Sequence, residues 1–376
     1  MHCRHRLLSV LIPGLVLLVV QSVVAQDVQT LELNAPAPEL DLPGVDGKTY
    51  RLEDFAEARV LVVIFTCNHC PTAQAYEERI MKLQADYRDK GVALVAISPN
   101  DPLTVRLDEL GYTDIGDSFE DMKFHAARRG FTFPYLYDGD TQRVSTAIGV
   151  LATPHVFIFD EQRRLRYHGR IDDADVKPPR SHDARNAIED LLAGRPVAVP
   201  KTRVFGCSTK WADKRDAARR SMEKWNAEPV ALETIDEQGL RQLVANKTEN
   251  YRLINVWSTT CVPCITELPE FVTINRMYRH RHFELYTLTL DPPDRRDAAL
   301  KVLKKSFVSC TNYIFESDDR DALAEALDPH WEGPVPYTLL IAPGGDIVRR
   351  WKDEIDPADV KGEIATRLGR TYASRK

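Results

Sequence analysis

The sequence lacks the features that would indicate a nucleic-acid-binding, repetitive or disordered protein. Its 50 Lys and Arg residues are outnumbered by 56 Asp and Glu residues, so there is no excess of basic charge to attract a polyanion. No low-complexity segment or short-period repeat interrupts the chain. The most basic stretch, residues 201–224, interleaves acidic residues with its Lys and Arg, as an exposed helix does. We therefore expect no nucleic-acid partner.

What is present fits an exported protein of two domains. A chain of 376 residues, 43% of them hydrophobic, is long enough to bury two cores. Arg4 and Arg6 precede an apolar run at 7–20, and small residues end at Ala25, so residues 1–25 are predicted to be a secretory signal peptide. The mature protein is then expected outside the cytoplasm, in the periplasm or secreted. An uncleaved N-terminal anchor is the alternative, because the apolar stretch nearly reaches the length of a membrane span.

Two pairs of cysteines follow short apolar runs. Residues 60–65 are typical of a buried parallel strand and lead into Cys67-Asn68-His69-Cys70, after which residues 73–89 have helical spacing. Residues 253–257 lead in the same way into Cys261-Val262-Pro263-Cys264. Buried strands that alternate with helices predict an α/β fold, with each cysteine pair at a strand-to-helix turn.

This position predicts redox chemistry. Free N–H groups and the helix dipole favour a thiolate at such a turn, so Cys67 is expected to be more acidic than a free cysteine. The first cysteine of each pair, Cys67 or Cys261, is the predicted nucleophile, and Cys70 or Cys264 resolves the mixed disulfide. A protonated His69 would stabilise the thiolate and make the first pair the more oxidising one.

Metal binding and purely structural disulfides are the competing interpretations of the two pairs. Zinc ribbons bring their cysteine pairs within ~15–20 residues of each other, whereas these pairs lie far apart in the chain. A disulfide across so short a loop would stabilise little by loop closure. We therefore predict redox centres with no metal and no cofactor. Removing the signal peptide leaves an even set of six cysteines, completed by Cys207 and Cys310.

At these motifs the chain resembles the thioredoxin superfamily twice. The first copy is similar to redoxins, which are peroxiredoxin-like, and the second to the TlpA/ResA type of thiol-disulfide oxidoreductase. The residues that carry the first resemblance are TCNHCP (66–71), AISPND (96–101), FPYLYD (133–138), Thr153-Pro154 and GCSTKW (206–211). Those that carry the second are Asn255, Trp257, Cys261, Pro263, Cys264, Glu267, Pro269 and Val335-Pro336. The resemblance implies two tandem thioredoxin-like domains of three α/β/α layers, at 31–196 and 230–370, with a linker at 197–229.

The resemblance also implies roles for residues outside the cysteine pairs. Thr153-Pro154 and Val335-Pro336 are expected to contain cis bonds, to face the cysteines and to bind an extended substrate. Glu267 is the expected proton relay of the second centre, because Asn255 replaces the acidic group that thioredoxins bury on this strand.

The third and sixth cysteines of the mature chain, Cys207 and Cys310, lie outside the two pairs. Cys207 lies in GCSTKW (206–211), the motif at the tail of the first domain. It is open to three interpretations: a third redox thiol for Cys67 or Cys70, a partner of Cys310, or a buried free thiol. Cys310 follows a helical segment and precedes an apolar run, so it is expected in the core.

Together these features predict an exported thiol-disulfide oxidoreductase that acts on protein thiols and disulfides or accepts electrons from a thiol reductant. His69 further predicts electron flow from the second centre to the first. A thiol peroxidase is one alternative, although the peroxiredoxin pattern PxxxTxxC is not met because Thr66 directly precedes Cys67. A copper(I) chaperone that uses the first cysteine pair and His155 is another.

Overall fold

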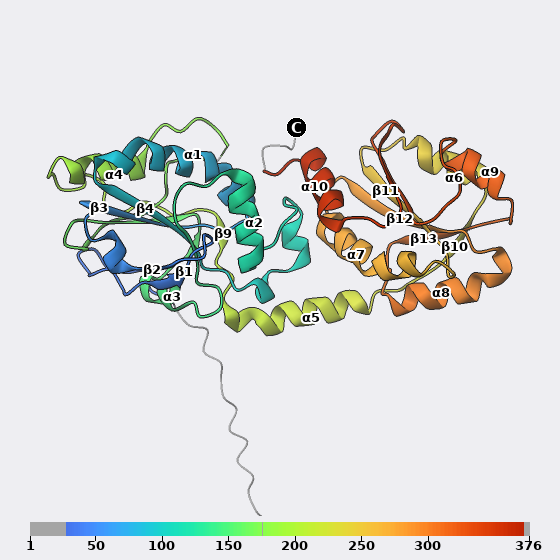
Figure 1. Cartoon of the computed structure of the whole chain (residues 1–376), viewed down its shortest axis with the longest axis horizontal. Helices are drawn as coiled ribbons and strands as arrows, with labels where there is room; N and C mark the ends of the chain where they lie inside the picture. The colour runs from blue at the N-terminus through green and yellow to red at the C-terminus, as the bar shows by residue number, and fades with distance from the viewer. Residues whose placement is uncertain (1–27, 175, 372–376) are drawn as a thin grey trace, which may run out of the picture.

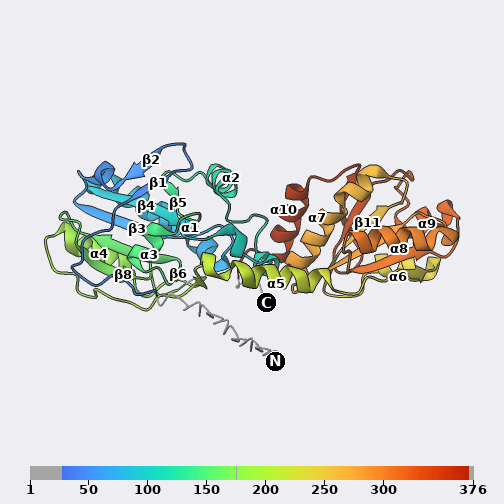
Figure 2. The ribbon, with the colours of Figure 1, turned by 90° about the horizontal axis from the view of Figure 1, so that it is seen from below.

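The computed structural model describes residues 28–174 and 176–371, which form two α/β units joined by helix α5 (Arg215–Asn226) (Figure 1). The predicted signal peptide lies outside the described residues. Within the part of the chain that is described, no helix is both long and apolar enough to cross a bilayer. Viewed from below, the two units lie side by side with α5 running beneath their junction (Figure 2).

The N-terminal unit is built on a five-stranded sheet in the order β5-β4-β3-β7-β8. Strand β3 (Val60–Phe65) is central and entirely buried, with β4 (Val92–Ser98) and β5 (Tyr135–Tyr137) parallel on one side. On the other side β7 (His155–Phe159) pairs antiparallel with β3, and β8 (Leu165–Gly169) antiparallel with β7. Alternate side chains of β3 enter two different cores, which explains its unbroken apolar sequence.

Both faces of this sheet are covered, which gives three layers. Helices α1 (Pro71–Tyr87), α2 (Phe119–Arg129) and α4 (Asp183–Leu192) pack on one face. Helix α3 (Arg143–Ile148) and the N-terminal hairpin pack on the other. The hairpin and short connecting elements are β1 (Asp41–Pro43), β2 (Thr49–Arg51), η1 (Leu52–Phe55), η2 (Arg88–Lys90), η3 (Pro102–Thr104), η4 (Leu107–Leu110), β6 (Ala152–Thr153) and β9 (Cys207–Ser208).

The C-terminal unit repeats the plan with one more edge strand, in the order β10-β13-β12-β11-β14-β15. Central β11 again has parallel neighbours on one side and an antiparallel pair on the other. Helices α7, α8 and α10 cover one face, and α6 and α9 the other. The bounds are β10 (Glu233–Ile235), α6 (Glu237–Ala245), β11 (Tyr251–Trp257), α7 (Val262–Tyr278), β12 (Phe283–Thr289), η6 (Pro293–Arg295), α8 (Arg296–Lys305), β13 (Thr311–Phe315), α9 (Arg320–Leu327), β14 (Tyr337–Ile341), β15 (Ile347–Lys352) and α10 (Pro357–Leu368).

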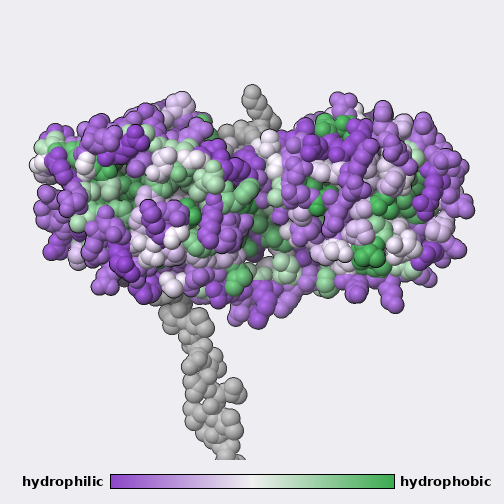
Figure 3. Space-filling view, viewed as in Figure 1, coloured by the Kyte–Doolittle hydropathy of each residue, from purple (hydrophilic) through white to green (hydrophobic). Residues whose placement is uncertain are grey.

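The segment predicted as a linker is largely ordered against both units. Strand β9 pairs with β6 of the N-terminal unit, η5 (Ala212–Lys214) leads into α5, and Glu228 forms an ion pair with Arg279 of the C-terminal unit at 2.8 Å. On the face shown in Figure 3 the outer surfaces are mainly hydrophilic, whereas hydrophobic residues reach the surface near the junction above α5.

The two units also contact each other directly. Leu110 of the N-terminal unit is buried in the core formed by α7 and α10. The hydroxyl of Tyr278 donates to the carbonyl of Thr113 at 2.7 Å in a buried position. Asp114 pairs with Arg128 of its own unit and with Arg370 of the other, each at 2.6 Å. Burial raises the pKa of Asp114, but its two arginine partners more than offset this and hold its net pKa well below the usual range.

Candidate redox-active sites

In the C-terminal unit the cysteine turn has the predicted arrangement. Cys261 is the N-cap of α7, its sulfur accepts from the Cys264 N–H at 3.3 Å, and a disulfide joins the two residues. The Cys261 sulfur lies 3.7 Å from the carbonyl oxygen of Val335, and the Val335–Pro336 bond is cis as predicted. Val262, between the cysteines, is 73% exposed, so this turn is open to a protein substrate.

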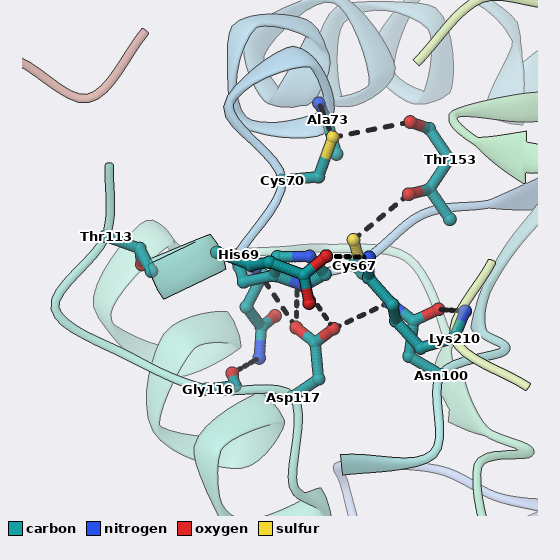
Figure 4. A network of polar contacts seen from close by, with 12 residues as sticks. Cys67, His69, Cys70, Ala73, Asn100, Thr113, Gly116, Asp117, Thr153 and Lys210 are labelled. Carbon is teal, nitrogen blue, oxygen red and sulfur yellow. Dashed lines mark hydrogen bonds and ion pairs between the residues drawn. The ribbon is translucent and has the colours of Figure 1, made fainter. Parts of the chain in front are cut away.

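In the N-terminal unit the second cysteine of the pair, and not the first, caps the helix. Here the N-cap is Cys70, whose sulfur accepts from the N–H of Ala73 at 3.5 Å. In its thiol form Cys70 donates to the carbonyl oxygen of Thr153 at 3.5 Å, and the Thr153–Pro154 bond is cis (Figure 4). By both contacts Cys70 corresponds to Cys261 of the other unit. Ala73 then occupies the position of the resolving cysteine.

Cys67 therefore does not have the position that the sequence suggested. It follows β3, outside the helix, and its sulfur lies 3.1 Å from the hydroxyl oxygen of Thr153. Burial raises the pKa of the Cys67 thiol well above that of a free cysteine. The prediction that Cys67 is more acidic than a free cysteine is wrong, because the helix and its free N–H groups begin after Cys70.

A buried ion pair lies beneath this turn. The His69 Nδ1 atom is 2.5 Å from the Asp117 carboxylate, and both side chains are almost fully buried (Figure 4). The same carboxylate accepts from the backbone N–H groups of Asn68 and His69 at 2.9 and 3.1 Å, and from the amide of Asn100 at 2.6 Å. Burial lowers the pKa of His69, but the Asp117 charge more than offsets it and the net pKa is raised. The Asp117 carboxylate thus favours the protonated, cationic form of the imidazole next to Cys70.

This cation acts on Cys70. Burial alone raises the pKa of a thiol, but hydrogen bonds from Cys207 and Cys67 and the charge of His69 outweigh burial, so the pKa of Cys70 lies well below that of a free cysteine. His69 therefore stabilises a thiolate, as the sequence suggested, but at Cys70. The first unit has a stabilised thiolate at the helix N-cap.

The remaining cysteines of the mature chain are separated. Cys207 packs against Cys67, Cys70 and Ala73, whereas Cys310 packs between two cores of the C-terminal unit. A disulfide between Cys207 and Cys310 is therefore excluded in this arrangement. Cys310, which was predicted to lie in the core, is partly buried and packs against its edge.

Potential metal ligands gather at one place in the described part of the chain. Ligand atoms of Cys67, His69 and Asp117 lie within 4.8 Å of one another. The ion pair and hydrogen bonds already described use His69 and Asp117. His155, suggested as a copper ligand, is outside this group; its Nδ1 accepts from the Leu151 N–H at 3.4 Å, and burial lowers its pKa to about 3.

Glu267, the predicted proton relay of the second centre, is a buried residue of α7. It is 3% exposed, accepts from Asn255 at 3.1 Å and from the Ile355 N–H at 3.2 Å, and stands one helical turn after Cys264. Burial raises its pKa to about 7, despite these hydrogen bonds. A carboxyl group with this pKa can exchange a proton with a thiol at neutral pH.

Replacing Glu267 with Gln tests the relay. We expect the rate at which Cys264 resolves a mixed disulfide to fall by roughly ten- to a hundredfold at pH 8, as for loss of a general base. The parent rate should rise with pH around 7, and the variant should lose that inflection. Because the folded pKa is raised from 4.5, the parent also loses stability as pH rises through 7, and Glu267→Gln should not. Single-turnover kinetics and thermal denaturation between pH 5 and 9 measure both; unchanged pH profiles would exclude the relay.

Sequence reasoning missed Asp117 and Asn100, which hold the His69 side chain of the first centre in its ion pair. Asp117 stands between a glycine and the serine that caps α2, where an acidic residue is ordinarily read as part of a capping sequence. Asn100 connects this carboxylate to the tail, since its side-chain oxygen accepts from the Lys210 N–H at 2.9 Å. A signal for Asn100 existed in the motif at 96–101, but no pattern linked it to Asp117.

Comparisons with known proteins relate parts of the chain to one family and to several solved structures. A family model described as Redoxin matches residues 32–188. A solved structure of a hypothetical protein from Sinorhizobium meliloti 1021 is 32% identical, covering 49% of this chain and 97% of that chain with a TM-score of 0.44. An uncharacterized conserved protein from Geobacillus kaustophilus is 37% identical, covering 48% and 92% with a TM-score of 0.43. The thioredoxin domain of a thiol-disulfide oxidoreductase from Bacteroides vulgatus is 18% identical, covering 36% and 86% with a TM-score of 0.30. A search of curated proteins found no match.

The central strand, the cysteine turn and the proline loop define a redox protein of the thioredoxin superfamily. The Redoxin family model covers residues 32–188, which form most of the N-terminal unit. This match supports oxidoreductase activity at the level of the family.

Proposed function

We propose that this protein is an exported thiol-disulfide oxidoreductase with two redox centres. The observation that carries the proposal is the repeated geometry of Cys70 and Cys261. Each is the N-cap of the helix that follows a central strand, and each sulfur lies within 3.7 Å of the carbonyl oxygen that precedes a cis proline. In the C-terminal unit Cys261 attacks the substrate disulfide and Cys264 resolves it. In the N-terminal unit Cys70 attacks the substrate disulfide, and Cys67 can resolve the mixed disulfide that forms at Cys70.

Substitution in the C-terminal turn tests the activity. Cys261→Ser should lower attack on a disulfide-linked peptide at the second centre by more than about a hundredfold, because the nucleophilic sulfur is lost. Cys264→Ser should instead accumulate a mixed disulfide at Cys261, visible by mass spectrometry. The matched control is Cys310→Ala, which removes a free thiol of the same unit outside the turn. Equal reactivity of Cys261→Ser and the parent protein would refute the proposal.

Electron transfer between the two centres, as suggested by His69, requires the units to move. The contact with the N-terminal unit involves the end of α7 that contains Tyr278, whereas Cys261 caps the opposite end. The helix has 17 residues, so at ~1.5 Å per residue these ends are about 25 Å apart. This interface therefore does not bring the two turns together. A relay within one molecule would proceed only after the units separate.

A further inference from the structure

Cys207 lies where a substrate cysteine would lie in the N-terminal unit. Its strand β9 pairs antiparallel with β6, and the register places Cys207 opposite Thr153. Thr153 is the residue whose carbonyl oxygen faces the Cys70 sulfur. Strand addition to an exposed backbone edge is a common way to bind an extended peptide. The tail of this unit therefore occupies the edge next to the proline as an intramolecular peptide.

The tail is held on both sides of Cys207. Gly206 has φ +147°, and a Cβ atom built there would lie 2.1 Å from the carbonyl oxygen of Thr153, so this close approach requires glycine. On the other side Lys210 donates its N–H to Asn100, and its carbonyl accepts from the Asp101 N–H, both at 2.9 Å. These contacts fix the thiol beside the cluster formed by Cys67, Cys70 and Ala73.

The three thiols differ in their access to solvent. Cys67 and Cys70 are 2% and 0% exposed, whereas Cys207 is partly exposed. An external reagent therefore meets Cys207 before it meets either buried sulfur. The helical position that supplies a resolving cysteine in the other unit is Ala73 here, which leaves the thiols outside the helix to complete the cycle.

We propose that Cys207 is a third redox thiol, which forms a disulfide with Cys70 and exchanges electrons with external dithiols at the surface. The proposal rests on the proposed function. When Cys67 and Cys70 are oxidised to a disulfide, the Cys207 thiol loses its proton and attacks the Cys70 sulfur. The Cys67 sulfur leaves and takes up a proton next to the Thr153 hydroxyl. The product is a disulfide between Cys70 and Cys207, with no net change in electrons.

Reduction then starts at the accessible sulfur. The thiolate of an external dithiol attacks Cys207, the bond to Cys70 breaks, and Cys70 leaves as a thiolate. The second thiol of the reductant then attacks the reductant's own first sulfur, which is bonded to Cys207. This step releases the Cys207 thiol and leaves the reductant oxidised by two electrons, as a disulfide. The low pKa of Cys70, which follows from hydrogen bonds and the charge of His69 after burial is offset, makes it a good leaving group.

The test uses full-length protein carrying Cys67→Ser, oxidised with glutathione disulfide. One of the two remaining thiols, Cys70 or Cys207, takes a glutathione and the other displaces it, and non-reduced peptide mapping by mass spectrometry should find Cys70 joined to Cys207 in most molecules. The Cys261–Cys264 disulfide in the same digest is the internal control. Adding Gly206→Ala should lower the yield by roughly tenfold, because a residue with a Cβ strains this backbone. Ser208→Ala, an exposed change in the same strand, should not lower it.

A second measurement does not depend on that variant. In the otherwise unchanged chain, Cys207→Ser should slow reduction of the Cys67–Cys70 disulfide by dithiothreitol by roughly tenfold, because the accessible exchange thiol is lost. Recovery of Cys70 and Cys207 only as separate thiols or glutathione adducts, or an unchanged reduction rate in Cys207→Ser, would overturn the inference. If the unmodified protein forms no Cys67–Cys70 disulfide at all, the proposed function of this centre fails instead.

Discussion

Replacing Cys70 with Ser should nearly abolish disulfide exchange at the N-terminal centre, whereas replacing Cys67 should spare the first step. Cys70 has the helix N-cap position and the lowered pKa, and Cys67 has the raised pKa. At pH 7 we expect Cys70→Ser to slow oxidation of this centre by glutathione disulfide by at least about a hundredfold, since a thiol with a raised pKa is almost entirely protonated. Cys67→Ser should slow it by less than about tenfold.

The measurement is residue-specific mass spectrometry of the oxidised, alkylated protein over time. The C-terminal cysteine pair in the same sample corrects for differences in reagent and folding. If Cys67→Ser proves the silent variant and Cys70→Ser still forms a glutathione adduct at Cys67, the assignment drawn from the helix boundary is wrong and the order read from the sequence holds.

Asp117→Asn should have the next largest effect, on both reactivity and stability. Without the carboxylate, the pKa of His69 is no longer raised, and the pH at which Cys70 becomes reactive should move upward. Breaking a buried ion pair by removing one partner costs ~3 kcal/mol or more. The folded pKa of Asp117 is lowered from 3.8 and that of His69 raised from 6.5, so the pair stabilises the fold above the first value and below the second. The stability difference should therefore be largest between these pH values.

Thermal denaturation and the pH profile of Cys70 oxidation measure the two effects. Asp138→Asn is the matched control, since Asp138 is a buried carboxylate that bonds Ser145 at 2.6 Å away from the cysteines. That variant should lose stability without moving the Cys70 profile. A profile that stays in place in Asp117→Asn would show that the ion pair supports the fold alone.

Much of the architecture could be predicted from periodicity. The strand predicted at 60–65 has the predicted bounds, and the strand predicted at 253–257 begins two residues earlier, at Tyr251. Continuous apolar runs identify these strands because both faces of each sheet are covered by other elements of the fold, which buries side chains on both faces of a central strand. Short strands such as β5, with three residues, are too brief to give such a pattern.

The sequence predicted which residues form the first site, but not which of its two cysteines caps the helix. The cysteines and prolines were recognised, because their spacing is local. Whether a helix starts at Cys67 or after Cys70 depends on one turn of backbone, and Pro71 suits the first helical position of the later start. The partners Asp117 and Cys207 come from segments distant in sequence, which only tertiary packing brings together.

The loop at residues 113–117 has a thermodynamic consequence for the whole chain. Its first residues contact the C-terminal unit through Tyr278 and Arg370, and its last, Asp117, charges the first centre. If separation of the two units changes the contacts of this loop, it also changes the redox equilibrium of the first centre. The two equilibria are then coupled by one free energy. The reciprocal also holds. A ligand that binds only separated units and an oxidant that reacts at Cys70 would then act as effectors of each other through this loop.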